Sequence, residues 1–150
     1  MSKAYPLQTL LDLSQLRMDN AARLLGELLS KEMEANERTV LLAQYRNEYE
    51  ARFVEAAKKG IGRDALSNYQ TFLGRLDQAI AQAQQIVDAS KQRTAEGQQA
   101  WLAQRSKVKA FDTLSQRHSS RELRIENRQE QKSQDEHGAR ERDGNSGYED

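Results

Sequence analysis

The side chains with the greatest capacity for acid–base or metal chemistry are the two histidines, His118 and His137. His137 directly follows Asp135 and Glu136, but adjacent residues of a helix point in different directions, so these three side chains are expected to form a solvated polar turn. The chain has no cysteine, and it lacks the HExxH, phosphate-loop, GxSxG and GxGxxG motifs. We therefore expect no catalytic residue, no cofactor and no bound metal ion.

A second feature is a row of basic residues near the C-terminus, at spacings of three and four residues. It consists of Arg117, Arg121, Arg124, Arg128 and Lys132. A row of glutamates, Glu122, Glu126 and Glu130, is offset from it by two residues, which is about 200° around a helix. Like charges four residues apart weaken an isolated helix, so the pattern favours a partner that neutralises the basic face. Two ordinary solvated faces are the alternative interpretation.

A third feature is a cluster of large side chains on both sides of a predicted turn. It contains Tyr45, Tyr49, Phe53, Phe72, Leu76 and Ala79. Phe53 and Phe72 are expected to lie off the buried face, which would leave Phe72 partly exposed. Exposed aromatic side chains that gather in one patch suggest a surface for a partner protein. The alternative is that they close one end of a hydrophobic core.

The elements that position these residues are predicted to be helices. Ala, Glu, Lys, Arg and Leu make up 72 of the 150 residues, whereas Val and Ile together number 8, and the chain has one proline. Such a composition is typical of long helices and coiled coils, and it disfavours a sizeable sheet. With 37% hydrophobic and 31% charged residues, the chain can hardly cover a compact two-layer core.

Helical periodicity organises the first 59 residues. The predicted buried row is Leu7, Leu10, Leu24, Leu28, Ala35, Leu42, Tyr45 and Tyr49, with a flanking row of Leu11, Met18, Ala22, Leu25 and Leu29. Residues 60–63 form a predicted turn, in which Gly60 can adopt the left-handed cap conformation. Asp64 is predicted to cap the helix that follows.

The second helix has the more regular pattern. From Leu73 to Phe111, residues at strict four-three spacing form a predicted coiled-coil seam with a left-handed supercoil. A turn centred on Ile61 brings together residues whose numbers sum to about 122, so that Thr94 faces Leu28 and Gly97 faces Leu24 or Leu25.

The predicted fold is therefore all-α: two long helices in an antiparallel left-handed coiled-coil hairpin. Residues 7–59 form helix 1, 60–63 the turn and 64–117 the paired part of helix 2. Residues 118–137 are an unpaired helical overhang, and residues 138–150 are a flexible, disordered tail.

Charge and hydropathy exclude two classes of partner. The 23 basic residues balance the 23 acidic residues, which argues against nucleic-acid binding by bulk positive charge. No apolar run approaches the roughly 20 residues that cross a bilayer, so direct membrane insertion is not expected. The first ten residues also lack the pattern of a secretory signal, and a cytoplasmic location is expected.

Four segments of the chain together resemble the FliJ family of flagellar export proteins. They are DNAARLLGELLSKEMEANERTVLLAQYRNEYEARF, NYQTFLGRLDQAIAQAQ, WLAQRSKVKAFDTLSQR and ENRQEQKSQDE, in an order and at spacings that match the family from Leu7 to about Glu136. Members of this family are antiparallel helical hairpins similar to the central stalk of rotary ATP synthases. The resemblance implies a non-enzymatic stalk and adaptor of the flagellar type III export apparatus, associated peripherally with the membrane.

The resemblance also implies partners and the residues that bind them. The partners are the hexameric export ATPase, whose ring assembly the family promotes, the cytoplasmic domain of the large export-gate membrane protein, and export chaperones. The implied gate-binding residues are Leu42, Tyr45, Tyr49, Phe72, Leu76 and Ala79. The candidates for contact with the ATPase ring are Arg17, Arg23, Arg117, Arg121, Arg124, Arg128 and Lys132. An alternative function is that of a general helical-hairpin chaperone for flagellar export substrates.

Overall fold

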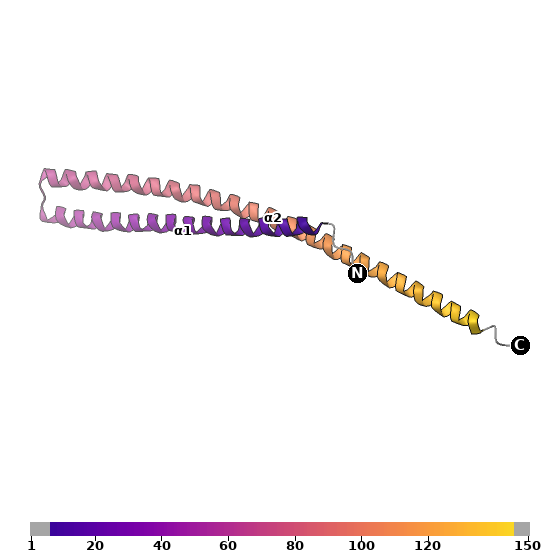
Figure 1. The fold of residues 1–150 in the computed structure, drawn as a ribbon. Helices are drawn as coiled ribbons and strands as arrows, with labels where there is room; N and C mark the ends of the chain where they lie inside the picture. Colours follow the sequence, from indigo (N-terminus) through magenta and orange to yellow (C-terminus); the bar gives the residue numbers. More distant parts are fainter. Residues whose placement is uncertain (1–6, 146–150) are drawn as a thin grey trace. The chain divides into compact units, whose positions relative to one another are not determined.

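A computed structural model describes residues 7–145 of the chain. Two helices account for nearly all of this range: α1 (Gln8–Lys59), of 52 residues, and α2 (Arg63–Asn145), of 83 residues. The two helices pack against each other as a hairpin, and residues 7–145 contain no strand (Figure 1). The predicted all-α hairpin fold is confirmed.

Glycines form the turn between the helices. Gly60 has a φ of 88°, in the left-handed region where a side chain is disfavoured, and its N–H donates a hydrogen bond of 3.2 Å to the Ala57 carbonyl. The Gly62 carbonyl accepts a hydrogen bond of 3.0 Å from Leu66 N–H, so Gly62 precedes the first turn of α2. Asp64 therefore lies within that first turn, where its charge complements the helix dipole, and it does not occupy the predicted capping position.

The structure divides into two compact units, of which the first spans Asp19–Ala103 and contains the turn. On α1 of this unit, the side chains that are at least half-buried recur at four-three spacing. They include Ala21, Leu25, Leu28, Glu32, Ala35, Thr39, Leu42, Arg46, Tyr49, Phe53 and Ala56, which we call the α1 seam. Leu24, which was expected on the buried face, is 53% exposed, and its neighbour Leu25 takes the seam position.

On α2 the buried residues of the same unit follow the predicted coiled-coil seam closely. Leu76, Ala83, Val87, Ser90 and Gly97 are buried, and Val87 is only 1% exposed. These residues keep the four-three spacing of a coiled-coil seam. The sequence therefore identified the buried face of α2 within this unit.

Two contacts confirm the predicted register. The Thr94 hydroxyl oxygen lies 3.4 Å from the Leu28 carbonyl oxygen, and these residue numbers sum to 122. A Cβ atom at Gly97 would lie 2.6 Å from Leu28 Cδ1 and 3.7 Å from Leu25 Cδ1, so glycine allows a close approach at this point. The two helices approach closely here because the facing α2 side chains are small.

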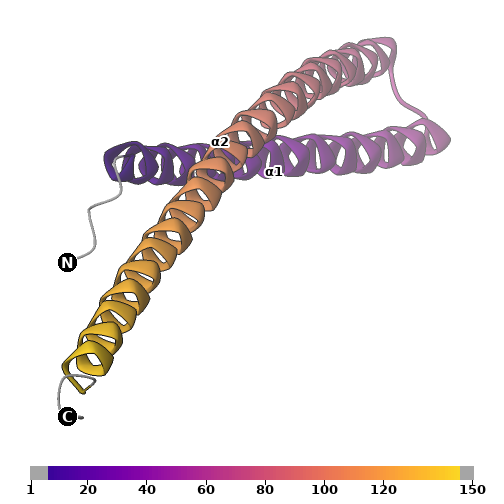
Figure 2. The same ribbon diagram turned by 90° about the vertical axis from the view of Figure 1, so that its right-hand side faces the viewer.

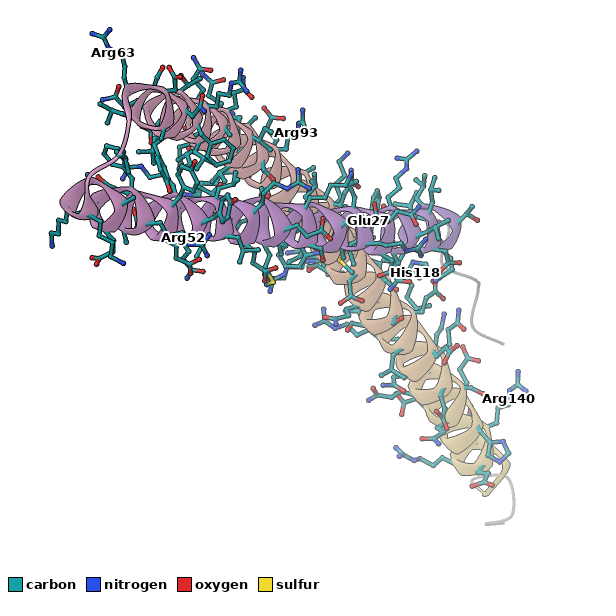
Figure 3. All side chains as sticks on the ribbon, turned by 90° about the vertical axis from the view of Figure 1, so that its left-hand side faces the viewer. Glu27, Arg52, Arg63, Arg93, His118 and Arg140 are labelled. Carbon is teal, nitrogen blue, oxygen red and sulfur yellow. The ribbon has the colours of Figure 1, made fainter. Side chains whose placement is uncertain are left out.

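Within the same unit, the ribbons of α1 and α2 move apart toward the turn (Figures 1 and 2). The sizes of the seam residues explain this taper. Small residues, Ser90 and Gly97, lie where the helices are closest, whereas aromatic rings from both helices fill the space near the turn. Figure 3 shows side chains from both ribbons occupying that space.

The second unit contains residues 7–18 and 104–145. Leu11 and Ser14 are buried in it, whereas Leu10, which was expected on the buried face, is 44% exposed. The error is the same as at Leu24: of two adjacent leucines, the second takes the buried position, because the heptad repeat against the facing helix decides between them. From residue 123 to residue 144 every residue is exposed except Gly138, which is half-buried.

α2 extends to Asn145, although the sequence predicted a flexible tail from residue 138. A single glycine in a helix costs only about 1 kcal/mol relative to alanine. Good helix formers follow Gly138, and His137 Nε2 lies 3.2 Å from Glu141 Oε1, one turn away. These local interactions stabilise α2 beyond Gly138. Residues 146–150 of the predicted tail lie outside the described residues.

Candidate functional site

A chain of aromatic rings joins α1 to α2 near the turn. Tyr49 and Phe72 are closest, with ring centroids 4.5 Å apart and planes at 60°. Tyr45 meets the same Phe72 ring edge-to-face, at 6.4 Å and 86°. Such arrangements bring the positive edge of one ring toward the negative face of the other, and they add stability beyond the burial of area.

The chain of rings continues through a residue that the sequence analysis missed. Tyr69 lies 5.3 Å from Tyr49 and 5.4 Å from Phe53, centroid to centroid. The numbers 53 and 69 sum to 122, the value that the predicted register gives for facing residues. Extending the predicted coiled-coil seam of α2 by one position before Leu73 would therefore have located Tyr69. Phe53, which was expected off the seam, is therefore a seam residue facing Tyr69.

Of the six residues assigned to gate binding, Tyr45, Tyr49 and Phe72 are joined by ring contacts and Leu42 lines a furrow with Tyr45. Leu76 and Ala79 follow Phe72 on α2, and the six differ in exposure. Leu76 is buried; Leu42, Tyr49, Phe72 and Ala79 are half-buried; and Tyr45 is 46% exposed. Most of these side chains are thus packed within the hairpin and stabilise it. Tyr45 presents the largest accessible surface of the group.

A shallow furrow extends this cluster along α1. It is lined by Glu34, Glu37, Arg38, Leu41, Leu42 and Tyr45. Leu41 is 64% exposed, and it was not among the predicted site residues. Together with Tyr45 it forms an apolar surface with both acidic and basic side chains at its border, which is the usual composition of a protein-binding patch.

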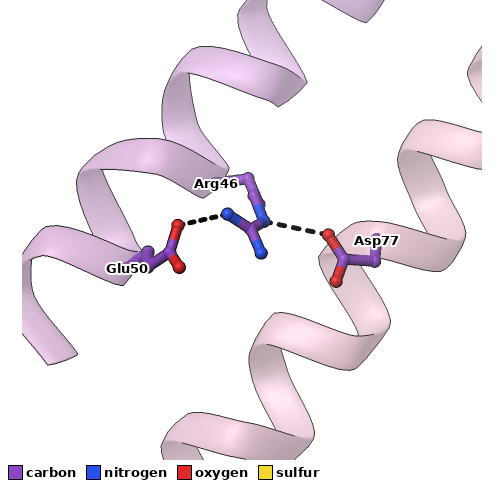
Figure 4. Close-up of polar contacts among 3 residues, drawn as sticks. All are labelled: Arg46, Glu50 and Asp77. Carbon is purple, nitrogen blue, oxygen red and sulfur yellow. Dashed lines mark hydrogen bonds and ion pairs between the residues drawn. The ribbon is translucent and has the colours of Figure 1, made fainter. Parts of the chain in front are cut away.

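An ion-pair bridge crosses the hairpin beside the cluster. Arg46 Nε donates a hydrogen bond of 2.9 Å to Asp77 Oδ1 on α2, and Arg46 also pairs with Glu50 one turn along α1 (Figure 4). The hydrogen bond to Asp77 raises the pKa of the Arg46 guanidinium above its ordinary value; the charges of Asp77 and Glu50 act in the same direction, and desolvation opposes them. The guanidinium stays charged, so the bridge holds the register at a seam position that carries no apolar side chain.

The seven candidates for ring contact are all exposed. Arg17 lies in the unit of residues 7–18 and 104–145, and Arg23 lies in the unit of residues 19–103. Arg117, Arg121 and Arg124 line a furrow along one face of α2, and Arg128 and Lys132 border a further furrow. Within the described residues, none of the seven forms an ion pair, so their charges are available to a partner.

In the part of the chain that the structure describes, no three or more His, Asp or Glu side chains gather as a metal site would require. Neither α1 nor α2 is apolar enough over a sufficient length to cross a membrane. Of the predicted site residues, those with a distinctive composition form the aromatic cluster and the basic face of α2.

Comparison with known proteins gives consistent matches. The family model described as "Flagellar FliJ protein" matches residues 2–143. A flagellar FliJ protein of Escherichia coli strain K12 is 34% identical over 140 residues, which cover 93% of this chain and 95% of that protein. A flagellar FliJ protein of Salmonella typhi is 33% identical over 140 residues, with the same coverage.

Proposed function

Since the chain belongs to the flagellar FliJ family, whose membership implies a role in flagellar export, we propose that it is a non-enzymatic stalk and adaptor of the export apparatus. In this function it binds the hexameric export ATPase, promotes assembly of its ring, and links the ring to the export gate and to export chaperones. It acts on the cytoplasmic side, peripherally associated with the membrane. The aromatic cluster, which both helices build and Tyr45 exposes, is the observation that carries the proposal.

The proposed gate-binding surface consists of Leu42, Tyr45, Tyr49, Phe72, Leu76 and Ala79. The ring contacts support it, because Phe72 holds Tyr45 in an edge-to-face arrangement at 6.4 Å and so orders an exposed aromatic side chain before any partner binds. A preordered aromatic side chain loses little conformational entropy on binding, and such residues commonly dominate interface energies.

The proposed ATPase-binding residues are those of the basic face of α2 and, each considered separately, Arg17 and Arg23 on α1. Their support is electrostatic: five basic side chains from Arg117 to Lys132 are exposed and form no ion pair within the described residues. An acidic surface on a partner would relieve the repulsion between these like charges.

Co-sedimentation of the full chain with its cognate export ATPase and nucleotide tests the stalk function. We expect a larger fraction of ATPase hexamer, with this chain bound to it, and a higher rate of ATP turnover. A pull-down with the cytoplasmic domain of the export gate tests the adaptor function separately. If the chain leaves both hexamer content and turnover unchanged, the stalk proposal is wrong.

The same experiment separates the alternative, a general hairpin chaperone for export substrates. Such a chaperone would bind unfolded substrate without raising ATPase turnover. The exposed apolar side chains of α1, such as Leu41, favour this alternative. A chain that suppresses substrate aggregation and does not stimulate the ATPase would support it.

A further inference from the structure

A second row of residues at heptad spacing runs along α1, outside the hairpin seam. Its members are Ala22, Gly26, Leu29, Met33, Asn36, Val40, Ala43 and Asn47, at spacings of four and three. Each member follows an α1 seam residue by one position, so the row lies about 100° around the helix from the seam. We call it the second seam.

The second seam is uncharged over its whole length and is mostly uncovered. Asp19 and Glu50, at the next heptad positions, bound it at its two ends. Leu29 is 50% exposed, Met33 63% and Val40 54%. In a chain with 31% charged residues, an exposed helical face with these properties is unusual, and such faces commonly mark binding surfaces.

The spacing of the row identifies the kind of structure that fits it. Apolar residues at alternating intervals of three and four pack against another helix, whose side chains fit into the holes between them. A groove follows this face in the middle of the row, lined by Leu29, Glu32, Met33, Asn36, Glu37, Val40, Leu41 and Gln44. Gly26 has nothing within 4 Å of a Cβ position, so the backbone of a further helix can approach closely there.

The charged residues that line the groove indicate which side chains a bound helix should have. The groove has two carboxylates, Glu32 and Glu37, and no basic side chain. We propose that the second seam binds an amphipathic helix of another protein, with apolar residues at heptad spacing and Lys or Arg beside them. A second copy of this chain is the poorer occupant, because a symmetric contact brings the glutamates of the two copies toward each other.

This surface is distinct from the aromatic cluster. Val40 and Tyr45 are five residues apart, which places their side chains about 140° apart around α1. The groove shares Glu37 and Leu41 with the furrow beside the aromatic cluster, so variants that separate the two surfaces are those at Met33 and Val40 for one and at Tyr45 and Phe72 for the other. The inference rests on the second seam alone and does not depend on the proposed export function.

Fluorescence anisotropy with the full chain and two designed helical peptides tests the proposal. Both peptides have leucine at the two seam positions of three heptads; one has lysine and the other glutamate at the flanking positions. We expect the lysine peptide to bind at least about tenfold more tightly than the glutamate peptide, a difference of about 1.4 kcal/mol. Equal affinities would overturn the proposed basic partner.

Variants locate the site of binding. Met33→Gln with Val40→Gln removes the apolar contacts without adding charge, and it should weaken binding of the lysine peptide at least about tenfold. Leu102→Gln, at a position on α2 that is 43% exposed, should leave binding unchanged, as should Tyr45→Ala with Phe72→Ala. Helicity by circular dichroism should be the same for all variants.

Two results would overturn the proposal even if a peptide binds. One is unchanged affinity in the Met33→Gln and Val40→Gln variant. The other is self-association in sedimentation velocity that this variant abolishes, which would make a second copy the occupant of the second seam.

Discussion

The hydroxyl oxygen of Thr94 lies 3.4 Å from the carbonyl oxygen of Leu28, a residue 66 positions earlier in the chain. The same hydroxyl lies 3.0 Å from the Ser90 carbonyl, one turn back in α2. A side-chain hydroxyl reaches the backbone of a facing helix only where the two helices are close, and one turn further along α2 a glycine continues this close approach. The small residues of α2 therefore set the spacing of the hairpin in this region.

Gly97→Leu is predicted to destabilise the hairpin. Even a Cβ atom at this position would lie 2.6 Å from Leu28 Cδ1, so a larger side chain must displace Leu28 and separate the helices. Overpacking of this kind costs about 1–3 kcal/mol in the free energy of unfolding. The matched control is Gly74→Leu, which has open space around it and should stabilise α2 by about 0.5–1 kcal/mol. Urea unfolding followed by circular dichroism would measure the free energy of unfolding of both variants. Equal changes in the two variants would contradict the prediction.

Val87→Ala is predicted to reduce the free energy of unfolding by about 2 kcal/mol, because two methyl groups are removed from a fully buried site. Val87 is 1% exposed, whereas its neighbour Ile86 is 55% exposed. Ile86→Ala should therefore change stability by less than about 0.5 kcal/mol. Thermal unfolding of the two variants would compare them directly; a larger loss for Ile86→Ala would mean that the buried face of α2 is misassigned.

The Arg46 bridge is predicted to make a small, salt-sensitive contribution to stability. Arg46→Gln should lower the unfolding midpoint less than Val87→Ala, and added salt should reduce the difference from the unsubstituted chain. Because pairing raises the Arg46 pKa, this contribution is complete below the ordinary arginine pKa and is lost only as pH rises through the higher value in the folded state. The effect of Arg46→Gln should thus be equal at neutral and mildly alkaline pH. An effect that disappears between these conditions would contradict this assignment.

Tyr45→Ala with Phe72→Ala is predicted to abolish binding to the cytoplasmic domain of the export gate. The double variant removes the exposed ring and the ring that orders it, while α1 and α2 keep most of their seam residues. Helicity should remain nearly intact, which circular dichroism would verify. Val54→Ala, on a different face of α1 and 44% exposed, is the control and should bind normally in the same pull-down. Undiminished gate binding by the double variant would remove the aromatic cluster from the proposed interface.

Arg124→Glu with Arg128→Glu is predicted to remove most of the stimulation of ATPase turnover. The substitutions reverse two charges of a face that pairs with no carboxylate within the described residues, so they should repel an acidic partner surface. Arg93→Glu, an exposed basic residue in the unit of residues 19–103, is the control. Full stimulation by the double variant would show that the basic row is an ordinary solvated face.

Local sequence determined the helices, the turn and the buried face of α2. Alanine, leucine and charged helix formers specify long helices, and Gly60 ends the first because it alone tolerates a φ of 88° without strain. On α2 the residues from Leu76 to Gly97 are small or apolar at every seam position, so hydropathy and packing indicate the same face. The register followed from the length of the turn.

Only the tertiary structure decided the individual seam positions of α1. Hydropathy placed Leu28, Leu42 and Tyr49 correctly on the seam, but it chose Leu10 and Leu24, which are exposed, in place of Leu11 and Leu25. It also missed the polar residues Glu32, Thr39 and Arg46, which occupy seam positions. A polar residue can lie on a seam when a facing partner satisfies it, as Asp77 does for Arg46, and that partner is 31 residues away in sequence. The aromatic contacts of Tyr69 likewise depend on the facing helix. Helix propensity depends on residues that are close in sequence, whereas burial depends on the residues of the facing helix. The exact seam positions of α1 could therefore not be derived from helix propensity.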